Sequence, residues 1–451
     1  MTTVTSWWGR FRYVWVAGAL SGLGAEIGEL ALPSLALITL GATAAEASWV
    51  RAAMLAPFLL VTLWFGVIVD RRARRPLMIG ADLVRGAVLV LVCLLALGGW
   101  LTIPLLIAAT AVLGTMTVLY QLADFAFLPQ IVPERHLIGA NAKITATQSA
   151  IQIAGSGVGG ALVQVLTAPI AVVMNALGYL LSGLLISRVR LPEPRPGAAE
   201  LRPGAVEPWP GAVELRPGAV ELRPGAPVRR SAIAEAKTGL SLLLRHPILR
   251  ALAAEAALWN FGNEIFMLAL AVHVLGDAAA GPMILGLIVT CGGVGAFVGS
   301  VSSARLTARY GYGRSLLVSL VLGNTAPLLG VLGAALVPAG AFPFLSAAFL
   351  ISGIGIGVAN SQSTSIRQIA VTEEVRGRVN AGYRLASWGA LSIGALVGGV
   401  LTTILGPVAA ALAGTAVMAL ASLPVALSPA RHVRTIEEVA PRSPLLTGRP
   451  S

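Results

Sequence analysis

The sequence predicts an all-α polytopic membrane protein with twelve transmembrane helices, and three observations lead to this fold class. Of the 451 residues, 56% are hydrophobic and only 12% are charged, whereas a soluble protein carries about 25% charged residues. Twelve apolar segments reach the length of about 20 residues that a helix needs to cross the hydrocarbon core. The cations are concentrated in every second loop. A soluble multi-domain enzyme is excluded, because too few polar residues remain to cover its surface.

The twelve predicted spans form two sets of six, separated by a long polar interruption. The first apolar segment contains two glutamates and is too long for a cleavable signal peptide, so we count it as a span. The predicted spans are 13–40, 48–69, 77–98, 103–128, 140–166 and 170–187, followed by 251–275, 282–303, 314–337, 341–366, 380–405 and 407–427.

The distribution of Arg and Lys predicts the orientation, because short loops rich in these residues stay in the cytoplasm. One set of loops, at 41–47, 99–102, 167–169, 276–281, 338–340 and 406, carries no Lys or Arg. The opposite loops carry arginines in clusters, and only Arg51 lies on the cation-poor side, just inside the second span. Both termini are therefore expected in the cytoplasm. The net charge of +12 then reflects topology rather than a nucleic-acid-binding surface.

Five regions follow from these spans. They are an N-terminal six-helix half (1–190), a Pro/Gly-rich cytoplasmic linker (191–230), an interfacial amphipathic helix (231–248), a C-terminal six-helix half (249–428) and a cytoplasmic tail (429–451). The linker repeats the unit RPGAVEL, and a Pro-Gly pair every seventh residue prevents a helix. A flexible tether is expected there, with a partner-binding array as the alternative. The amphipathic helix is expected along the inner membrane interface, ending at Pro247.

The two halves are predicted to be a duplication. The segment that contains Glu26 resembles the segment that contains Glu264, at an offset of 238 residues (264 − 26 = 238), and Gln130 matches Gln368 at the same offset. Three glycines match at an offset of 239, namely Gly155, Gly159 and Gly160 with Gly394, Gly398 and Gly399. Because six spans are an even number, both halves share one orientation. Such parallel repeats place the substrate site near the midplane, between the halves.

A family resemblance emerges from the loop between the second and third spans. The run from Gly66 through Asp70, Arg71 and Arg74 to Arg75 resembles the signature loop of the major facilitator superfamily. The stretches 82–85, 128–141 and 367–380 resemble the twelve-span drug–proton antiporter branch, which includes macrolide and siderophore exporters. The resemblance covers both halves and implies the major facilitator fold of two parallel six-helix halves.

The acidic residues within the spans are the first candidate site. A charge at the bilayer centre costs about 2.5–3.5 kcal/mol on insertion scales, so such residues need a role. Glu26 and Glu29 share a face of the first span, and Glu264 lies in the middle of the seventh, one turn after Asn260. These four residues are predicted to line a central cavity and to serve proton coupling or substrate binding, since desolvation favours protonation of a carboxylate. Structural hydrogen bonding between helices is the alternative.

The resemblance also implies a conformational latch. In proteins of this family, the acid and the arginine of the signature loop form a charge cluster with an acid of the fourth span, and here these positions are Asp70, Arg71, Arg74 and Asp124. Asp82 and Arg85 are expected to pair across one helical turn and to join this latch. Glu255 is expected to reach the interface and to have a structural role.

Three glycines of the fifth span, Gly155, Gly159 and Gly160, resemble the antiporter motif GPxxGG, with Ser156 where the family has Pro. A face of small residues that packs against other helices is the alternative interpretation. The two cysteines lie in apolar runs, and neither they nor the four histidines have metal-ligand spacing. No phosphate-binding loop or nucleophile–base arrangement is visible. We therefore expect no enzyme, no cofactor and no metal.

The sequence thus predicts a secondary active transporter that couples protons to the efflux of a small amphipathic compound, such as a drug, an antibiotic or a siderophore-like molecule. Its expected location is a bacterial cytoplasmic membrane, since Arg greatly outnumbers Lys, as in GC-rich genomes. The expected partners are the small-molecule substrate, protons and lipid, without nucleic acid, and the expected state is a monomer. The alternatives are a facilitator or uptake transporter without proton antiport, and a membrane scaffold or sensor that transports nothing.

Overall fold

The computed structural model describes residues 7–189, 232–276, 281–371 and 373–439. The predicted linker at 191–230 and most of the predicted tail lie outside these residues. Within the described residues, ten helices are long and apolar enough to cross a membrane. The other two predicted spans are also helical. The second is divided at Val61 into two helices, and the fifth forms the long helix from Glu134 to Leu166.

The first set of helices covers the N-terminal part of the chain, and we call it the N-terminal bundle. It consists of α1 (Trp7–Ser34), a π-helical turn η1 (Leu35–Thr39), α2 (Ala44–Leu60), α3 (Thr62–Arg71), α4 (Arg74–Leu97), α5 (Ile103–Ile131), α6 (Glu134–Leu166) and α7 (Ala168–Ser187).

The second set, the C-terminal bundle, begins at Pro247. It consists of α9 (Pro247–Gly276), α10 (Gly281–Tyr310), α11 (Tyr312–Leu336), a 3₁₀ turn η2 (Pro338–Gly340), α12 (Ala341–Ile369), α13 (Glu373–Leu405), α14 (Pro407–Leu420) and α15 (Leu423–Ala426), with short 3₁₀ turns η3 (Pro429–His432) and η4 (Ile436–Val439). The amphipathic segment forms α8 (Ala232–Arg245), which contacts α9 and α13 of this bundle and also α3 of the other.

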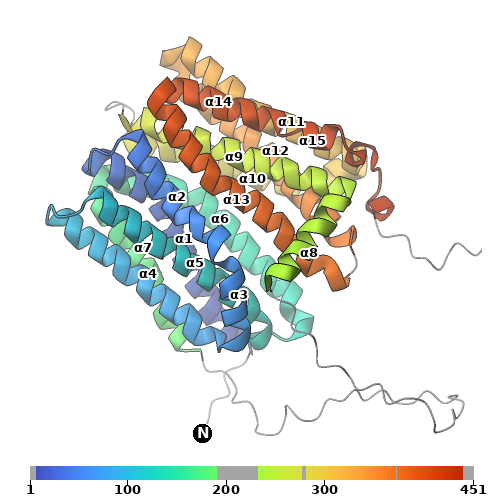
Figure 1. Cartoon of the computed structure of the whole chain (residues 1–451), viewed down its shortest axis with the longest axis horizontal. Helices are drawn as coiled ribbons and strands as arrows, with labels where there is room; N and C mark the ends of the chain where they lie inside the picture. The colour runs from blue at the N-terminus through green and yellow to red at the C-terminus, as the bar shows by residue number, and fades with distance from the viewer. Residues whose placement is uncertain (1–6, 190–231, 277–280, 372, 440–451) are drawn as a thin grey trace, which may run out of the picture.

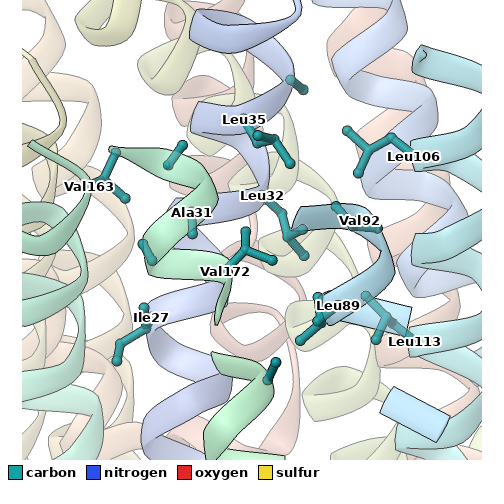
Figure 2. Packing of buried hydrophobic residues seen from close by; sticks show 14 of the residues in the cluster. Ile27, Ala31, Leu32, Leu35, Leu89, Val92, Leu106, Leu113, Val163 and Val172 are labelled. Atoms are coloured by element: carbon teal, nitrogen blue, oxygen red, sulfur yellow. The ribbon is translucent and has the colours of Figure 1, made fainter. Parts of the chain in front are cut away.

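Figure 1 shows the two bundles side by side, the N-terminal one in blue to green and the C-terminal one in yellow to red. Two seams join them, α2 against α13 and α6 against α10. Inside the N-terminal bundle, apolar side chains of α1, α4, α5, α6 and α7 interdigitate, among them Leu32, Leu89, Leu113 and Val172 (Figure 2).

Side-chain hydrogen bonds fix the start of α2, which carries Arg51, and of α9, which carries Glu264. The Thr43 side chain accepts a hydrogen bond from the Glu46 backbone N–H, and the Glu46 carboxylate accepts one from the Thr43 backbone N–H at 2.8 Å. This capping box satisfies two free donors at the start of α2. At the start of α9, His246 Nδ1 accepts from the backbone N–H of Leu249 at 3.4 Å. Burial lowers the pKa of His246, which favours the neutral ring that this bond requires.

Candidate functional site

A cavity of about 500 Å³ lies between the two bundles. Its walls are mostly apolar and include the aromatic side chains of Trp259, Phe266 and Phe349. The polar side chains in the wall come from both bundles and include Glu26, Glu29, Arg51, Gln152, Asn263 and Glu264. Three predicted site residues, Glu26, Glu29 and Glu264, thus lie in one cavity. A mostly apolar cavity of this volume, with few polar groups, is typical of a small-molecule site.

Arg51 on α2 connects the two bundles within the wall of this cavity. Its Nε donates to Glu264 Oε2 and its Nη2 to Glu264 Oε1, both at 3.0 Å. Its Nη1 donates to Glu29 Oε2 at 2.7 Å. Glu264 is 4% exposed, whereas the Glu29 side chain is 45% exposed. A bidentate arginine–carboxylate pair is among the stronger polar contacts in proteins, so the buried charge of Glu264 is compensated from the other bundle.

Glu26 differs from the other two cavity carboxylates. Among the described residues, its side chain has no ion-pair partner, and its charged neighbour is Glu29 on the same helix. It faces the cavity beside the mainly apolar wall described above. A carboxyl group in such a position can accept a proton or a cation without first breaking an ion pair.

Asn260 differs from the prediction, because it lines a second cavity of about 230 Å³ inside the C-terminal bundle. Its side-chain nitrogen donates to the carbonyl oxygen of Ser387 at 2.8 Å. Glu255 also lines this cavity, and Asn324 Nδ2 donates to its carboxylate at 3.2 Å. A hydrogen bond from α11 thus holds the Glu255 side chain against the wall of this cavity. Trp259 lines both cavities.

Two of the residues predicted for the latch, Asp82 and Arg85, form a buried ion pair across one turn of α4. The guanidinium carbon of Arg85 lies 4.1 Å from the ring centroid of Tyr179 on α7 and 4.5 Å from that of Tyr120 on α5. These contacts connect three helices of one bundle, so they favour a structural role for the pair.

Among the side chains that the structure describes, no ion pair joins the other latch residues. Arg71 is exposed, Arg74 and Asp124 are half-buried, and the side chain of Asp70 lies outside the described part. No ion pair joins Asp124 to an arginine among the described side chains. The contact of Arg75 was not predicted from the sequence. Its Nε donates to the carbonyl oxygen of Ile186, at the end of α7, with a distance of 3.2 Å. Basic groups are favourable at a helix C-terminus, which is the signal that identifies this contact.

The three predicted packing glycines lie on faces of α6 that contact two different helices. A Cβ atom at Gly155 would be 2.6 Å from Glu26 Cβ, and one at Gly159 would be 3.2 Å from Ile27 Cα, both on α1. A Cβ atom at Gly160 would be 2.6 Å from the carbonyl oxygen of Pro282 on α10. These positions therefore allow backbones to approach closely, both within the N-terminal bundle and across the seam.

The corresponding glycines of α13 repeat this pattern. A Cβ atom at Gly394 would be 3.2 Å from Glu264 Cβ, and one at Gly398 would be 2.9 Å from Ile265 Cα. A Cβ atom at Gly399 would clash with Ser48 on α2, across the other seam. Glu26 and Glu264 thus occupy equivalent places in the two bundles, as their offset in the sequence indicates.

Gly160→Leu is expected to separate α6 from α10, because the backbone of Pro282 cannot move aside as a side chain can. Overpacking of this kind costs about 1–3 kcal/mol. Disulfide formation between cysteines at positions 164 and 283, where Gln164 Oε1 accepts from the Met283 backbone N–H, measures the separation once Cys93 and Cys291 are replaced by Ala. Cross-linking falls in Gly160→Leu but not in Gly18→Leu, where the added side chain meets open space. Equal cross-linking in both variants contradicts this account.

Sequence reasoning left Arg51 without a role, although it proves to be the cation of the site. The available signal was its position, since it is the single cation on the cation-poor side of the predicted topology and stands within a span. A charge in such a place needs a partner, and the carboxylates of the first and seventh spans were available. What the sequence did not provide was the spatial proximity of α2 and α9.

Comparisons with known proteins agree with this architecture. The family model of the Major Facilitator Superfamily matches residues 14–329, more than half of the chain. An uncharacterized MFS-type transporter of Sinorhizobium fredii, y4rN, is 24% identical over 395 residues, which are 86% of this chain and 87% of that protein.

Among solved structures, a bacterial homologue of the iron transporter ferroportin in an inward-facing state has a TM-score of 0.68 and 17% identity, with 93% of this chain and 98% of that chain covered. The nucleoside transporter NupG has a TM-score of 0.67 and 10% identity, with 92% of this chain and 99% of that chain covered. At such identities the likeness establishes the fold alone. Together with the ten apolar helices and the family match, these findings show that the chain is an all-α polytopic membrane protein of the Major Facilitator Superfamily.

Proposed function

We propose that the protein is a proton-coupled exporter that moves a small amphipathic compound across a bacterial cytoplasmic membrane by alternating access. The observation that carries the proposal is the mostly apolar cavity between the bundles, with Glu26 in its wall. Among the described residues, Glu26 has no ion-pair partner. An apolar wall with a few polar groups suits an amphipathic ligand, and a carboxyl group without a compensating cation suits reversible protonation.

In this mechanism the parallel bundles rock about the cavity between them. Glu26 takes up a proton from the side opposite the termini and releases it on the side of the termini, while the substrate moves the other way. We propose that both termini and the predicted linker at 191–230 lie in the cytoplasm, because short loops rich in arginine stay on that side. Asp70, Arg71, Arg74 and Asp124 are proposed to latch one of the two states, with Asp82 and Arg85 as the anchor of α4. The working unit is proposed to be a monomer.

Transport by purified protein in proteoliposomes tests the proposal. The probes are ethidium, a cationic amphipath, and fluorescein, an anionic one, each followed by fluorescence with and without an imposed pH gradient. Movement of a probe that is accelerated by a gradient and accompanied by opposite proton movement supports antiport. Equal counterflow with and without the gradient indicates a facilitator, and binding without flux indicates a scaffold or sensor. A susceptibility panel in a host without its own pumps extends the range of compounds.

A further inference from the structure

We propose that the second cavity, which lies inside the C-terminal bundle, binds a small zwitterion of the amino acid type, with an ammonium group, a carboxylate and a short apolar side chain. Glu255 binds the ammonium group and Arg367 binds the carboxylate. The site goes beyond the proposed export and does not rest on it, because the described residues of its wall all come from α9, α11, α12 and α13 of one bundle.

The cavity contains one charge of each sign. Among the described residues that line it, Glu255 on α9 and Arg367 on α12 are the charged ones, and no ion pair joins them. Two opposite charges that line one cavity of about 230 Å³ without pairing are complementary to a ligand that carries both charges itself.

Glu255 lacks an opposite charge. Its carboxylate accepts a hydrogen bond from Asn324 Nδ2 at 3.2 Å, and Asn324 is 1% exposed. This amide is neutral, and no cation among the described residues forms an ion pair with Glu255. A charge within a membrane span needs compensation. An ammonium group supplies both the opposite charge and N–H donors, so Glu255 suits the cationic end of the ligand.

Arg367 lacks an opposite charge as well. Its Nε donates to the carbonyl oxygen of Ser363 at 3.3 Å. Its Nη1 donates to Asn380 Oδ1 at 3.2 Å, and its Nη2 donates to Thr364 Oγ1 at 3.1 Å. These acceptors are neutral and use three of the five N–H groups of a guanidinium. The central carbon of the guanidinium lies 3.8 Å from the ring centroid of Tyr383. The group is thus held in place with donors left for a carboxylate.

The two charged side chains converge from different depths. Glu255 is eight residues from the start of α9 at Pro247 (255 − 247 = 8), or about 12 Å along the helix. Arg367 is two residues from the end of α12 at Ile369 (369 − 367 = 2), or about 3 Å. Both of these helix ends lie on the side of the chain termini. The bond to Ser363, one turn earlier, directs the guanidinium away from that end and toward the depth of Glu255. This arrangement suits a ligand whose two charges are on neighbouring groups.

The remaining wall suits a short apolar side chain. It includes Leu252, Leu316 and Ile356 together with the rings of Trp259 and Trp388. Pockets for drug-sized ligands begin at about 300 Å³, so a cavity of about 230 Å³ favours a smaller molecule. The size, the apolar part and the two charges together indicate an amino acid or a close analogue.

The central cavity offers no equivalent match. Its cation among the described lining residues is Arg51, and both Glu264 and Glu29 already bind the guanidinium of this residue. In the second cavity, in contrast, neither charge is engaged by an opposite one. A zwitterion is therefore expected in the second cavity, and Trp259 and Ile356, which line both cavities, separate it from the central one.

Ligand titrations of the purified full-length protein in detergent micelles at pH 8 test the site. The probes are L-leucine, isopentylamine, which is leucine without the carboxylate, and 4-methylpentanoate, which is leucine without the ammonium group. Because Trp259 and Trp388 line the cavity, the tryptophan fluorescence follows binding. The wild type is expected to bind leucine about 10- to 150-fold more tightly than either analogue, the factor that one hydrogen bond to a charged group provides.

Two variants assign the charges. In Glu255→Gln the affinity for leucine is expected to fall to that for 4-methylpentanoate, while the affinity for 4-methylpentanoate itself stays near the wild-type value. In Arg367→Gln the affinity for leucine falls to that for isopentylamine. A glutamine at position 255 can still accept from Asn324 Nδ2, so retained binding of 4-methylpentanoate shows that the cavity remains intact.

The site is overturned if leucine does not bind to the wild type, or if Glu255→Gln weakens the binding of leucine and of 4-methylpentanoate alike. Loss of leucine binding in Glu26→Gln instead of Glu255→Gln also overturns it, because leucine then lies in the central cavity. If Arg367→Gln does not fold, the comparison in Glu255→Gln decides alone. The titrations use neither a pH gradient nor ethidium or fluorescein, so failure of this site and failure of the exporter are distinguishable.

Discussion

Replacement of Glu26 by Gln is expected to abolish the acceleration of efflux by a pH gradient while the protein remains folded in the membrane. Glutamine keeps the size and polarity of the side chain but cannot carry a proton on and off. In the cavity, Glu26 has no cationic partner among the described residues, so the substitution leaves no opposite charge unpaired. The loss therefore reports on proton exchange rather than on the packing of α1 against α6.

The measurement is the rate of probe efflux from proteoliposomes with and without the gradient, at matched amounts of inserted protein. Coupling of about 1–3 kcal/mol corresponds to a 5- to 150-fold acceleration, which disappears in Glu26→Gln. Glu255→Gln is the matched control, because Glu255 lies inside the C-terminal bundle and away from the central cavity. Normal acceleration in Glu26→Gln contradicts the coupling role. An equal loss of acceleration in Glu255→Gln indicates instead that the proton path runs through the second cavity.

The fold was largely predictable from the sequence, because lipid imposes simple rules. Helical spans need a minimum length of apolar residues, and the predicted segments correspond to helices of the structure throughout. The division of the second span at Val61 was not predicted. Pro57 lies inside α2 and accepts, through its carbonyl oxygen, the bond from Val61 N–H that closes this helix. A proline within an apolar run signals irregularity, but the run itself gives no indication of where the helix ends.

The candidate site was predictable in part, for a different reason. Burial of charge in lipid identified Glu26, Glu29 and Glu264 without any structure, since each needs a reason to be there. Which of them is paired depends on the helix that faces it, and no periodicity within one helix contains that information. Asn260 illustrates the same limit, because a position one turn from Glu264 turned out to face a different cavity.

Replacement of Arg85 by Met is expected to cause a large loss of stability. Asp82 is 0% exposed and Arg85 is 3% exposed, and removal of one partner of a buried pair leaves an uncompensated charge, at a cost of about 3–5 kcal/mol. The stacking of the guanidinium between Tyr120 and Tyr179 is lost as well. The measurement is the free energy of unfolding of the purified protein in micelles titrated with a denaturing detergent.

The double variant Asp82→Asn with Arg85→Met distinguishes an unpaired charge from lost packing. Removal of both charges of a buried pair is often close to neutral, so most of the stability is expected to return, apart from the contribution of the two tyrosine contacts. If instead the pair is a latch that stabilises one transport state, Arg85→Met leaves the free energy of unfolding unchanged and shifts the distance between the bundles. The two roles thus predict opposite results in the unfolding and distance measurements, and the enclosure of Arg85 by α4, α5 and α7 of one bundle favours the structural role.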